Sequence, residues 1–136
     1  MLRGYGADVR FVFREFPLSL HRHARRAARA ALAAHAQDPF WAYADLLFRN
    51  QSELGEKALR TYATRAGLDV ARFRAALAGE ASAGARLRDV REGRRTGVRW
   101  TPSYFVNGVR VRAAGEAGLR QAIDRALEQT AAGPKE

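Results

Sequence analysis

Three histidines are the first side chains in the sequence whose type and spacing could bind a metal. His21 and His23 are separated by one residue, and His35 follows in the same predicted helical region. Residues two apart on a helix point to different sides. The pair could converge if residues 18–23 are irregular, but zinc usually takes three or four ligands and a third is not evident. We therefore expect no metal site.

Nucleophiles and acid–base groups give no catalytic pattern either. Asp45, Glu53 and Asp89 have the character of surface or helix-capping carboxylates, and neither a Gly-rich phosphate loop nor a Ser-His-Asp arrangement emerges. The 136 residues include no cysteine, which excludes a disulfide, a Cys-ligated metal and a thiol nucleophile. We expect no catalytic residue and no cofactor.

Arginine dominates the charge of the chain, whose formal net charge is +10. A basic surface attracts phosphate-rich partners. Aromatic side chains that would stack on single-stranded bases are not interleaved with the arginines. We therefore interpret the two arginine clusters as solvated helix faces, and keep a nucleic-acid-binding module only as an alternative function. The clusters are Arg22, Arg25, Arg26 and Arg29 in the first predicted helix, and Arg86, Arg88, Arg91, Arg94 and Arg95 in the last helix before the hairpin described below.

The elements that would position these residues begin with a predicted strand over Val9–Phe13. Its residues are β-branched or aromatic on both faces apart from Arg10, which is typical of a buried, interior strand. Pro17 ends the strand, because proline has no backbone N–H to donate. A helix rich in alanine is predicted next, over about residues 20–36.

Four shorter helical segments follow, each marked by a capping or breaking residue. Asp38, Ser52 and Asp69 are predicted N-caps of successive helices. Gly67 is placed to end the second of these in a left-handed conformation. A break over Gly79–Gly84 is expected before the basic helix.

A β-hairpin and a final helix complete the predicted elements. Short strands are expected over Ser103–Val106 and Val109–Ala113, joined by Asn107-Gly108, a strong local signal for a tight hairpin turn. The final helix is amphipathic, with an apolar stripe of Leu119, Ala122, Ile123, Ala126 and Leu127.

This order of elements predicts one α/β domain over residues 1–130 with a frayed tail over 131–136. The N-terminal sequence has neither a long apolar stretch nor a small-residue cleavage site, so we predict no signal peptide. No segment approaches the ~20 apolar residues that span a bilayer. We therefore expect a cytoplasmic protein without a membrane partner.

Short motifs occur in a specific order over roughly residues 5–128. They are Phe13-Arg14-Glu15-Phe16-Pro17-Leu18-Ser19 with His23-Ala24, Phe40-Trp41, Asp45-Leu46-Leu47-Phe48, Asn50-Gln51, Tyr62-Ala63, Gly67-Leu68-Asp69 with Phe73, Gly97-Val98, and Thr101-Pro102-Ser103-Tyr104-Phe105-Val106-Asn107-Gly108. Together they resemble the DsbA-like thiol–disulfide oxidoreductases of the thioredoxin superfamily. The resemblance implies a thioredoxin-like fold with a helical insertion over about residues 38–95.

The chain departs from the pattern of that family in two places. The family begins with a strand and a helix whose N-terminus carries Cys-x-x-Cys, and the present sequence contains neither cysteine. The expected fold therefore lacks its first strand and active-site helix, and we expect no redox activity, because the thiolate is the nucleophile of disulfide exchange. The family also commonly places glycine where Trp100 stands, which alters the expected shape of the substrate groove.

The resemblance implies a peptide-binding role for one loop. In the family, the backbone before a cis-proline pairs with an extended substrate peptide, and the matching residues here are Thr101 and Pro102. Trp100 is expected either to form an aromatic wall of this site or to fill the space of the missing helix, and we favour the second interpretation.

The missing central strand also suggests a partner. Unpaired apolar strand edges recruit other chains, so we expect a homodimer in which a second copy fills the gap. Direct closure of the remaining strands, or a segment from another polypeptide, are the alternatives.

The predicted function is that of a non-catalytic protein-binding, peptide-binding or oligomerising domain. The first alternative is a shortened form of an active oxidoreductase whose Cys-x-x-Cys segment lies upstream, which the helix-ending character of residues 1–6 supports. The second alternative is the nucleic-acid-binding module already mentioned.

Overall fold

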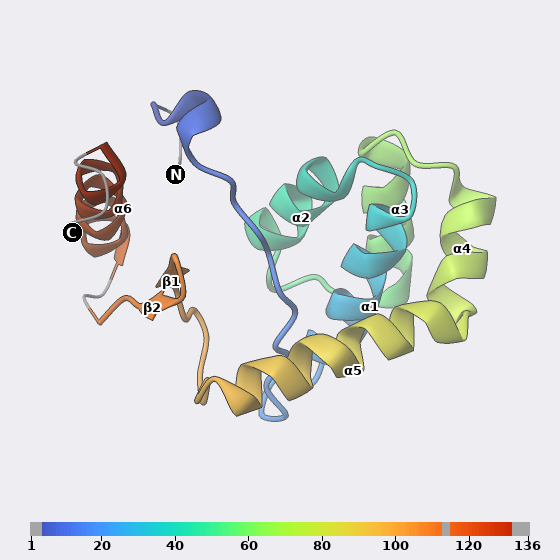
Figure 1. The fold of residues 1–136 in the computed structure, drawn as a ribbon. Helices are drawn as coiled ribbons and strands as arrows, with labels where there is room; N and C mark the ends of the chain where they lie inside the picture. The colour runs from blue at the N-terminus through green and yellow to red at the C-terminus, as the bar shows by residue number, and fades with distance from the viewer. Residues whose placement is uncertain (1–3, 113–114, 132–136) are drawn as a thin grey trace. The chain divides into compact units, whose positions relative to one another are not determined.

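The structure is a computed structural model that describes residues 4–112 and 115–131, apart from the side chains of residues 80–82. The elements group into two compact units (Figure 1). Residues 14–99 form the helical unit, and the residues before and after them form the second unit, which we call the hairpin unit.

Five helices make up the helical unit: α1 (Ala24–His35), α2 (Phe40–Arg49), α3 (Glu56–Arg65), α4 (Val70–Ala78) and α5 (Glu80–Arg95). The first helix, α1, contacts each of the other four. Its alanines make this possible, because small side chains let neighbouring helices approach closely. Ala30, Ala33 and Ala34 are fully buried.

Aromatic side chains fill the centre of the helical unit. Tyr43, Leu59 and Phe73 are its largest fully buried side chains, and the rings of Tyr43 and Phe73 lie 5.4 Å apart. The Tyr43 hydroxyl donates a hydrogen bond to the Leu59 carbonyl oxygen at 3.2 Å, so the buried phenol is satisfied. Burial also raises the pKa of Tyr43 above its ordinary value.

Some predicted helix ends are confirmed and others are wrong. Asp69 caps α4 by accepting a hydrogen bond from the Arg72 N–H at 2.8 Å, and Gly67 has a left-handed φ of 79°. Asp38 does not cap α2, because its own φ is 84° and the cap position falls on Pro39. Ser52 is also not a cap, since α3 starts later, at Glu56 after Gly55.

The break predicted over Gly79–Gly84 is present only at Gly79, because α5 starts at Glu80 and continues through Gly84. A second glycine of α5 is needed for packing. A Cβ atom added at Gly93 would lie 2.7 Å from Cδ2 of Phe16, so the aromatic ring occupies the space that glycine leaves open. The Phe16 segment is thereby packed on α5.

The hairpin unit contains a 3-10 turn over Gly6–Asp8, strands β1 (Phe105–Val106) and β2 (Val109–Arg110), and helix α6 (Gly115–Ala131). Asn107 and Gly108 both have positive φ, 46° and 81°, as the predicted tight turn requires. Phe105 pairs with Arg110, and Val106 with Val109. The strands are shorter than predicted, and Ala113 and the tail over 132–136 lie outside the described residues.

The predicted buried strand over Val9–Phe13 is wrong. Among the residues that the structure describes, β1 and β2 form the one sheet, and residues 9–13 belong to neither strand. Phe11 is 39% exposed and Val12 is 53% exposed. Strand propensity describes how well side chains suit a paired surface, so it does not by itself make a segment a strand.

Across the described ranges, no helix is both long and apolar enough to cross a membrane.

Candidate functional site

The loop over residues 100–103 precedes β1 and contains the three residues predicted to bind peptide. The Thr101–Pro102 peptide bond is cis. The Ser103 hydroxyl donates a hydrogen bond to the Trp100 carbonyl oxygen at 2.7 Å, which closes the loop on itself. The hairpin continues this local order, since the Val111 N–H donates to the Tyr104 carbonyl oxygen at 2.9 Å.

Trp100 lies on the surface of this loop. It is 61% exposed, so the interpretation that its indole fills the space of a missing helix is wrong. The guanidinium of Arg110, on β2, lies 5.9 Å from the centre of the indole ring, within the range of a cation–π contact. Arg110 also donates to the Ser103 hydroxyl at 3.5 Å, so one strand residue contacts both ends of the loop.

Thr101 and Pro102 are exposed beside this indole. The described residues offer no backbone hydrogen bond to Thr101, either at its N–H or at its carbonyl oxygen. Phe105 and Val109 on the adjoining strands are 39% and 71% exposed. The loop therefore combines an aromatic surface, apolar neighbours and an accessible backbone edge, which suit binding of an extended chain.

The histidines are not brought together with other ligands. His21 and His23 lie in the turn that precedes α1, and His35, at the end of α1, packs edge-on against Phe40 with ring centres 5.9 Å apart. Within residues 4–112 and 115–131, no three His, Asp or Glu side chains form a group that could hold a metal ion.

Two of the candidate carboxylates, Asp45 and Asp89, form contacts that stabilise the helical unit. Asp45 forms an ion pair with Arg49 at 2.8 Å, one turn along α2. Asp89 accepts hydrogen bonds from the Arg14 guanidinium at 3.3 Å and from the Glu15 backbone N–H at 2.9 Å. Asp89 therefore holds the first residues of the helical unit against α5.

Glu15 is a buried acid that the sequence did not single out. Burial raises the pKa of Glu15 to about 8, and the negative charge of the nearby Asp89 contributes to the rise. The available signal was its position between Phe13 and Phe16. Glu15 lies in the packing of the helical unit, so its ionisation state is coupled to the stability of that unit.

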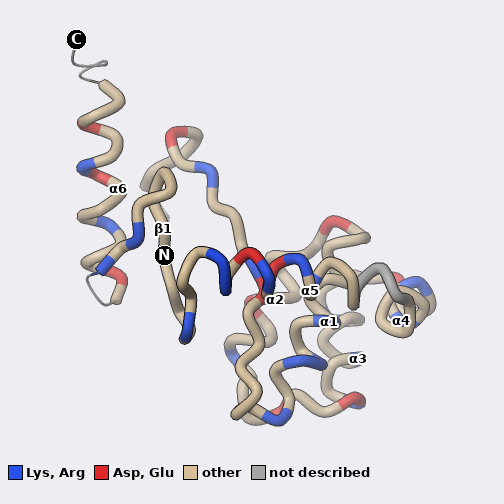
Figure 2. Tube along the Cα trace, turned by 60° about the horizontal axis from the view of Figure 1, so that its bottom comes forward, with Lys and Arg blue, Asp and Glu red and all other residues tan. Residues whose placement is uncertain are grey.

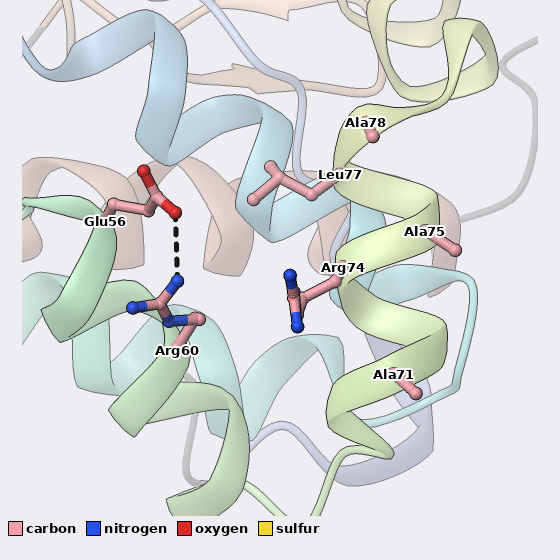
Figure 3. Close-up of a pocket in the computed structure, with 7 residues that line it drawn as sticks. All are labelled: Glu56, Arg60, Ala71, Arg74, Ala75, Leu77 and Ala78. Atoms are coloured by element: carbon pink, nitrogen blue, oxygen red, sulfur yellow. Dashed lines mark hydrogen bonds and ion pairs between the residues drawn. The ribbon is translucent and has the colours of Figure 1, made fainter.

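A concave surface lies between α3 and α4, with a volume of about 500 Å³. Figure 3 shows the ion pair between Arg60 and Glu56 on one wall and the side chain of Arg74 extending from the other wall. The remaining lining is apolar and comes from Ala71, Ala75, Leu77 and Ala78. Arg60 and Glu56 form an ordinary i,i+4 surface ion pair. The groove therefore offers fewer groups that could recognise a ligand than the Trp100 loop does.

The sequence matches one known protein family and is similar to several known proteins. A sequence family described as thioredoxin matches residues 3–125. The chain is 45% identical over 104 residues to the Na⁺/H⁺ antiporter NhaA 3 of Salinispora tropica, covering 76% of the chain and 16% of that antiporter. It is 38% identical over 119 residues to the Na⁺/H⁺ antiporter NhaA of Herminiimonas arsenicoxydans, covering 88% of the chain and 19% of the antiporter.

The chain thus spans less than a fifth of the length of these curated relatives. No solved structure matches it. The mostly helical structure with a small two-stranded sheet is compatible with a thioredoxin-like fold. Since the family match covers nearly the whole sequence, the chain belongs to the thioredoxin family.

Proposed function

We propose that this chain is a DsbA-like thioredoxin domain that binds an extended polypeptide at the Trp100 loop and performs no thiol chemistry of its own. The observation that carries the proposal is the exposed edge of the loop, where Thr101 and Pro102 lie beside an indole that is 61% exposed. Thiolates perform disulfide exchange, and the chain has no cysteine. Binding is the family function that the residues can still support.

The chemistry of the loop favours an extended peptide over a small metabolite. An extended chain can pair with the accessible N–H and carbonyl oxygen of Thr101. Trp100 supplies a large, flat contact area, and Arg110 contacts its ring. Exposed tryptophans are frequent binding hot spots because they contribute much area with few rotatable bonds.

The names of the relatives suggest which polypeptide is bound. The matched segment is part of proteins named Na⁺/H⁺ antiporters. We infer that the peptide ligand is a segment of such a transporter, either in the same polypeptide or in another one. On this proposal, residues 1–130 form a single thioredoxin-like domain with a helical insertion over about residues 38–95. The cytoplasmic location stays a prediction.

Binding can be tested with the intact chain and an array of overlapping short peptides that cover the Salinispora tropica antiporter. Trp41→Phe leaves Trp100 as the one remaining indole, because the chain has two tryptophans. We expect a blue shift of its emission when a peptide covers the ring. Trp100→Ala should weaken binding of the selected peptide by at least about tenfold.

Trp41→Ala is the matched control, because Trp41 is 52% exposed and belongs to the helical unit. It should leave peptide affinity within about twofold of the parent, since Trp41 is outside the loop. Equal losses in the two variants, or no loss in either, would contradict the proposed site.

Homodimerisation is a second candidate function, favoured by the exposed Phe11 and Val12 and by the short strands of the hairpin. A second copy could supply a strand to this unit. Light scattering at micromolar concentration tests it, and a monodisperse monomer would end the idea. The oxidoreductase alternative is tested by sequencing the DNA upstream of the reading frame, where an in-frame Cys-x-x-Cys codon pattern would support an enzyme.

A further inference from the structure

Helix α5 presents a strongly basic face to solvent. Four of its arginines are exposed: Arg88, Arg91, Arg94 and Arg95. Figure 2 marks the positions of Lys and Arg along the backbone in blue. Leu87 directly precedes Arg88, lies one helical turn before Arg91 and is 45% exposed. Within residues 87–95 of the same helix, Asp89, Val90 and Gly93 are the less exposed residues. The helix is therefore amphipathic, with its charged side outward.

The positive charge of this face is not neutralised within the described residues. Their ion pairs include none with these four arginines. The two acidic residues nearby, Asp89 and Glu92, instead lie 3.3 and 3.8 Å from the guanidinium of Arg14. The four charges are thus available to an anion outside the helical unit.

The spacing of the arginines fits several phosphate groups. Residues three and four apart on a helix are surface neighbours, with Cβ atoms about 5–6 Å apart. Arg88, Arg91 and Arg95 follow this spacing and line a hollow of about 290 Å³ together with Glu92. Guanidinium groups form paired hydrogen bonds with phosphate oxygens. A repeating row of phosphates is the expected counterpart.

We propose that the basic face of α5 binds an anionic lipid surface. Leu87 distinguishes this partner from nucleic acid, because an exposed leucine among arginines can enter the boundary between headgroups and acyl chains. Base stacking needs aromatic side chains, and α5 has none. This proposal does not depend on peptide binding at Trp100.

The test is co-sedimentation of the full chain with phosphatidylcholine vesicles that contain either no phosphatidylserine or about 30% of it. Binding should require phosphatidylserine. The triple variant Arg88→Gln, Arg91→Gln, Arg95→Gln should reduce partitioning by about a hundredfold, at roughly fivefold per arginine near an anionic surface. Glutamine is a good helix former, and circular dichroism verifies that the variant is folded.

The matched control removes three charges elsewhere in the helical unit: Arg22→Gln, Arg25→Gln and Arg26→Gln, at exposed positions in and just before α1. It should reduce partitioning by less than about fivefold, because net charge alone acts weakly at ~0.15 M salt. Equal losses in the two triple variants would overturn the proposal. Tight binding to a DNA duplex without binding to the anionic vesicles would also overturn it, as would competition by free inorganic phosphate that abolishes vesicle binding.

Discussion

The two units of this chain differ in how much apolar surface they bury. Of the buried apolar residues that the structure describes, Leu119 and Ile123 belong to the hairpin unit, and all others belong to the helical unit. A hydrogen bond also joins two helices of this unit. The Arg29 guanidinium of α1 donates to the Leu77 carbonyl oxygen, near the end of α4, over 2.6 Å. Its stability therefore arises from its own packing.

The hairpin unit has the opposite character. It holds two-residue strands and one helix with two buried side chains, yet it carries the loop to which we assign peptide binding. Regions with few buried contacts open at lower free energy than packed cores. In this chain, the stable part and the proposed binding part are therefore different stretches of sequence.

The largest expected effect comes from truncating a core side chain in each unit. Phe73→Ala should lower the free energy of unfolding by about 3–5 kcal/mol, because it leaves a cavity beside Tyr43. Ile123→Ala should cost clearly less, because fewer buried side chains surround it. Urea denaturation followed by circular dichroism gives the first value, and hydrogen exchange of each unit gives the second. Equal costs would break the comparison between the units.

The next effect concerns pH and the buried Glu15 in the helical unit. Its folded-state pKa of about 8 lies above the unfolded value of 4.5, so the unfolded chain releases this proton first. Stability should therefore fall as pH rises from about 4.5 to about 8. Glu15→Gln should remove that slope and add several kcal/mol at pH 8–9, at most ~1.4 kcal/mol for each unit by which burial raises the pKa.

Glu92→Gln serves as the control for this titration, because Glu92 is on α5 with its side chain 52% exposed. Its substitution should leave the slope in place. Thermal denaturation across this pH range measures both variants, and a slope that persists in Glu15→Gln would show that another group causes it.

A pair of glycine substitutions tests the packing of Phe16 on α5. Gly93→Ala should destabilise the helical unit by about 1–3 kcal/mol, because the new methyl group meets the Phe16 ring at 2.7 Å. Gly84→Ala lies on the same helix, and no described atom outside the helix backbone lies within 4 Å of its added Cβ. It should stabilise by about 0.5–1 kcal/mol through helix propensity. Opposite signs in urea denaturation would confirm the contact.

The smallest expected effect is at the N-cap of α4. Asp69→Ala should cost about 1 kcal/mol, because it removes the acceptor for the Arg72 N–H. Asp69→Asn keeps an acceptor and should cost only a few tenths of that. The two variants are compared by their urea midpoints, and equal losses would mean that the carboxylate charge is important, not the hydrogen bond.

Local signals in the sequence predicted local features well. Asp69 and Gly67 act within one helical turn, and Asn107-Gly108 sets φ at two neighbouring residues, so nearby residues suffice to specify them. Ser52 failed because a helix can start at any of several adjacent residues, and α3 starts at Glu56, after Gly55. Asp38 failed because its own left-handed φ removed it from the cap position.

Features that depend on distant residues were not predictable in the same way. The strand propensity of residues 9–13 is real, but pairing requires a neighbour that these residues cannot specify. The burial of Glu15 depends on packing against α5, more than 70 residues away in the sequence. At the candidate site, the sequence marked Trp100, Thr101 and Pro102 through a family resemblance, while the contact from Arg110 came from the hairpin register.

The helical unit is an uninterrupted stretch, residues 14–99, whereas the hairpin unit is assembled from segments on either side of it. During synthesis on the ribosome, every residue of the helical unit is therefore made before Trp100 is added. Domains can fold as they emerge, so the helical unit can be complete while the proposed binding loop is still being translated. An unfinished chain released at that stage would be a helical protein without the loop.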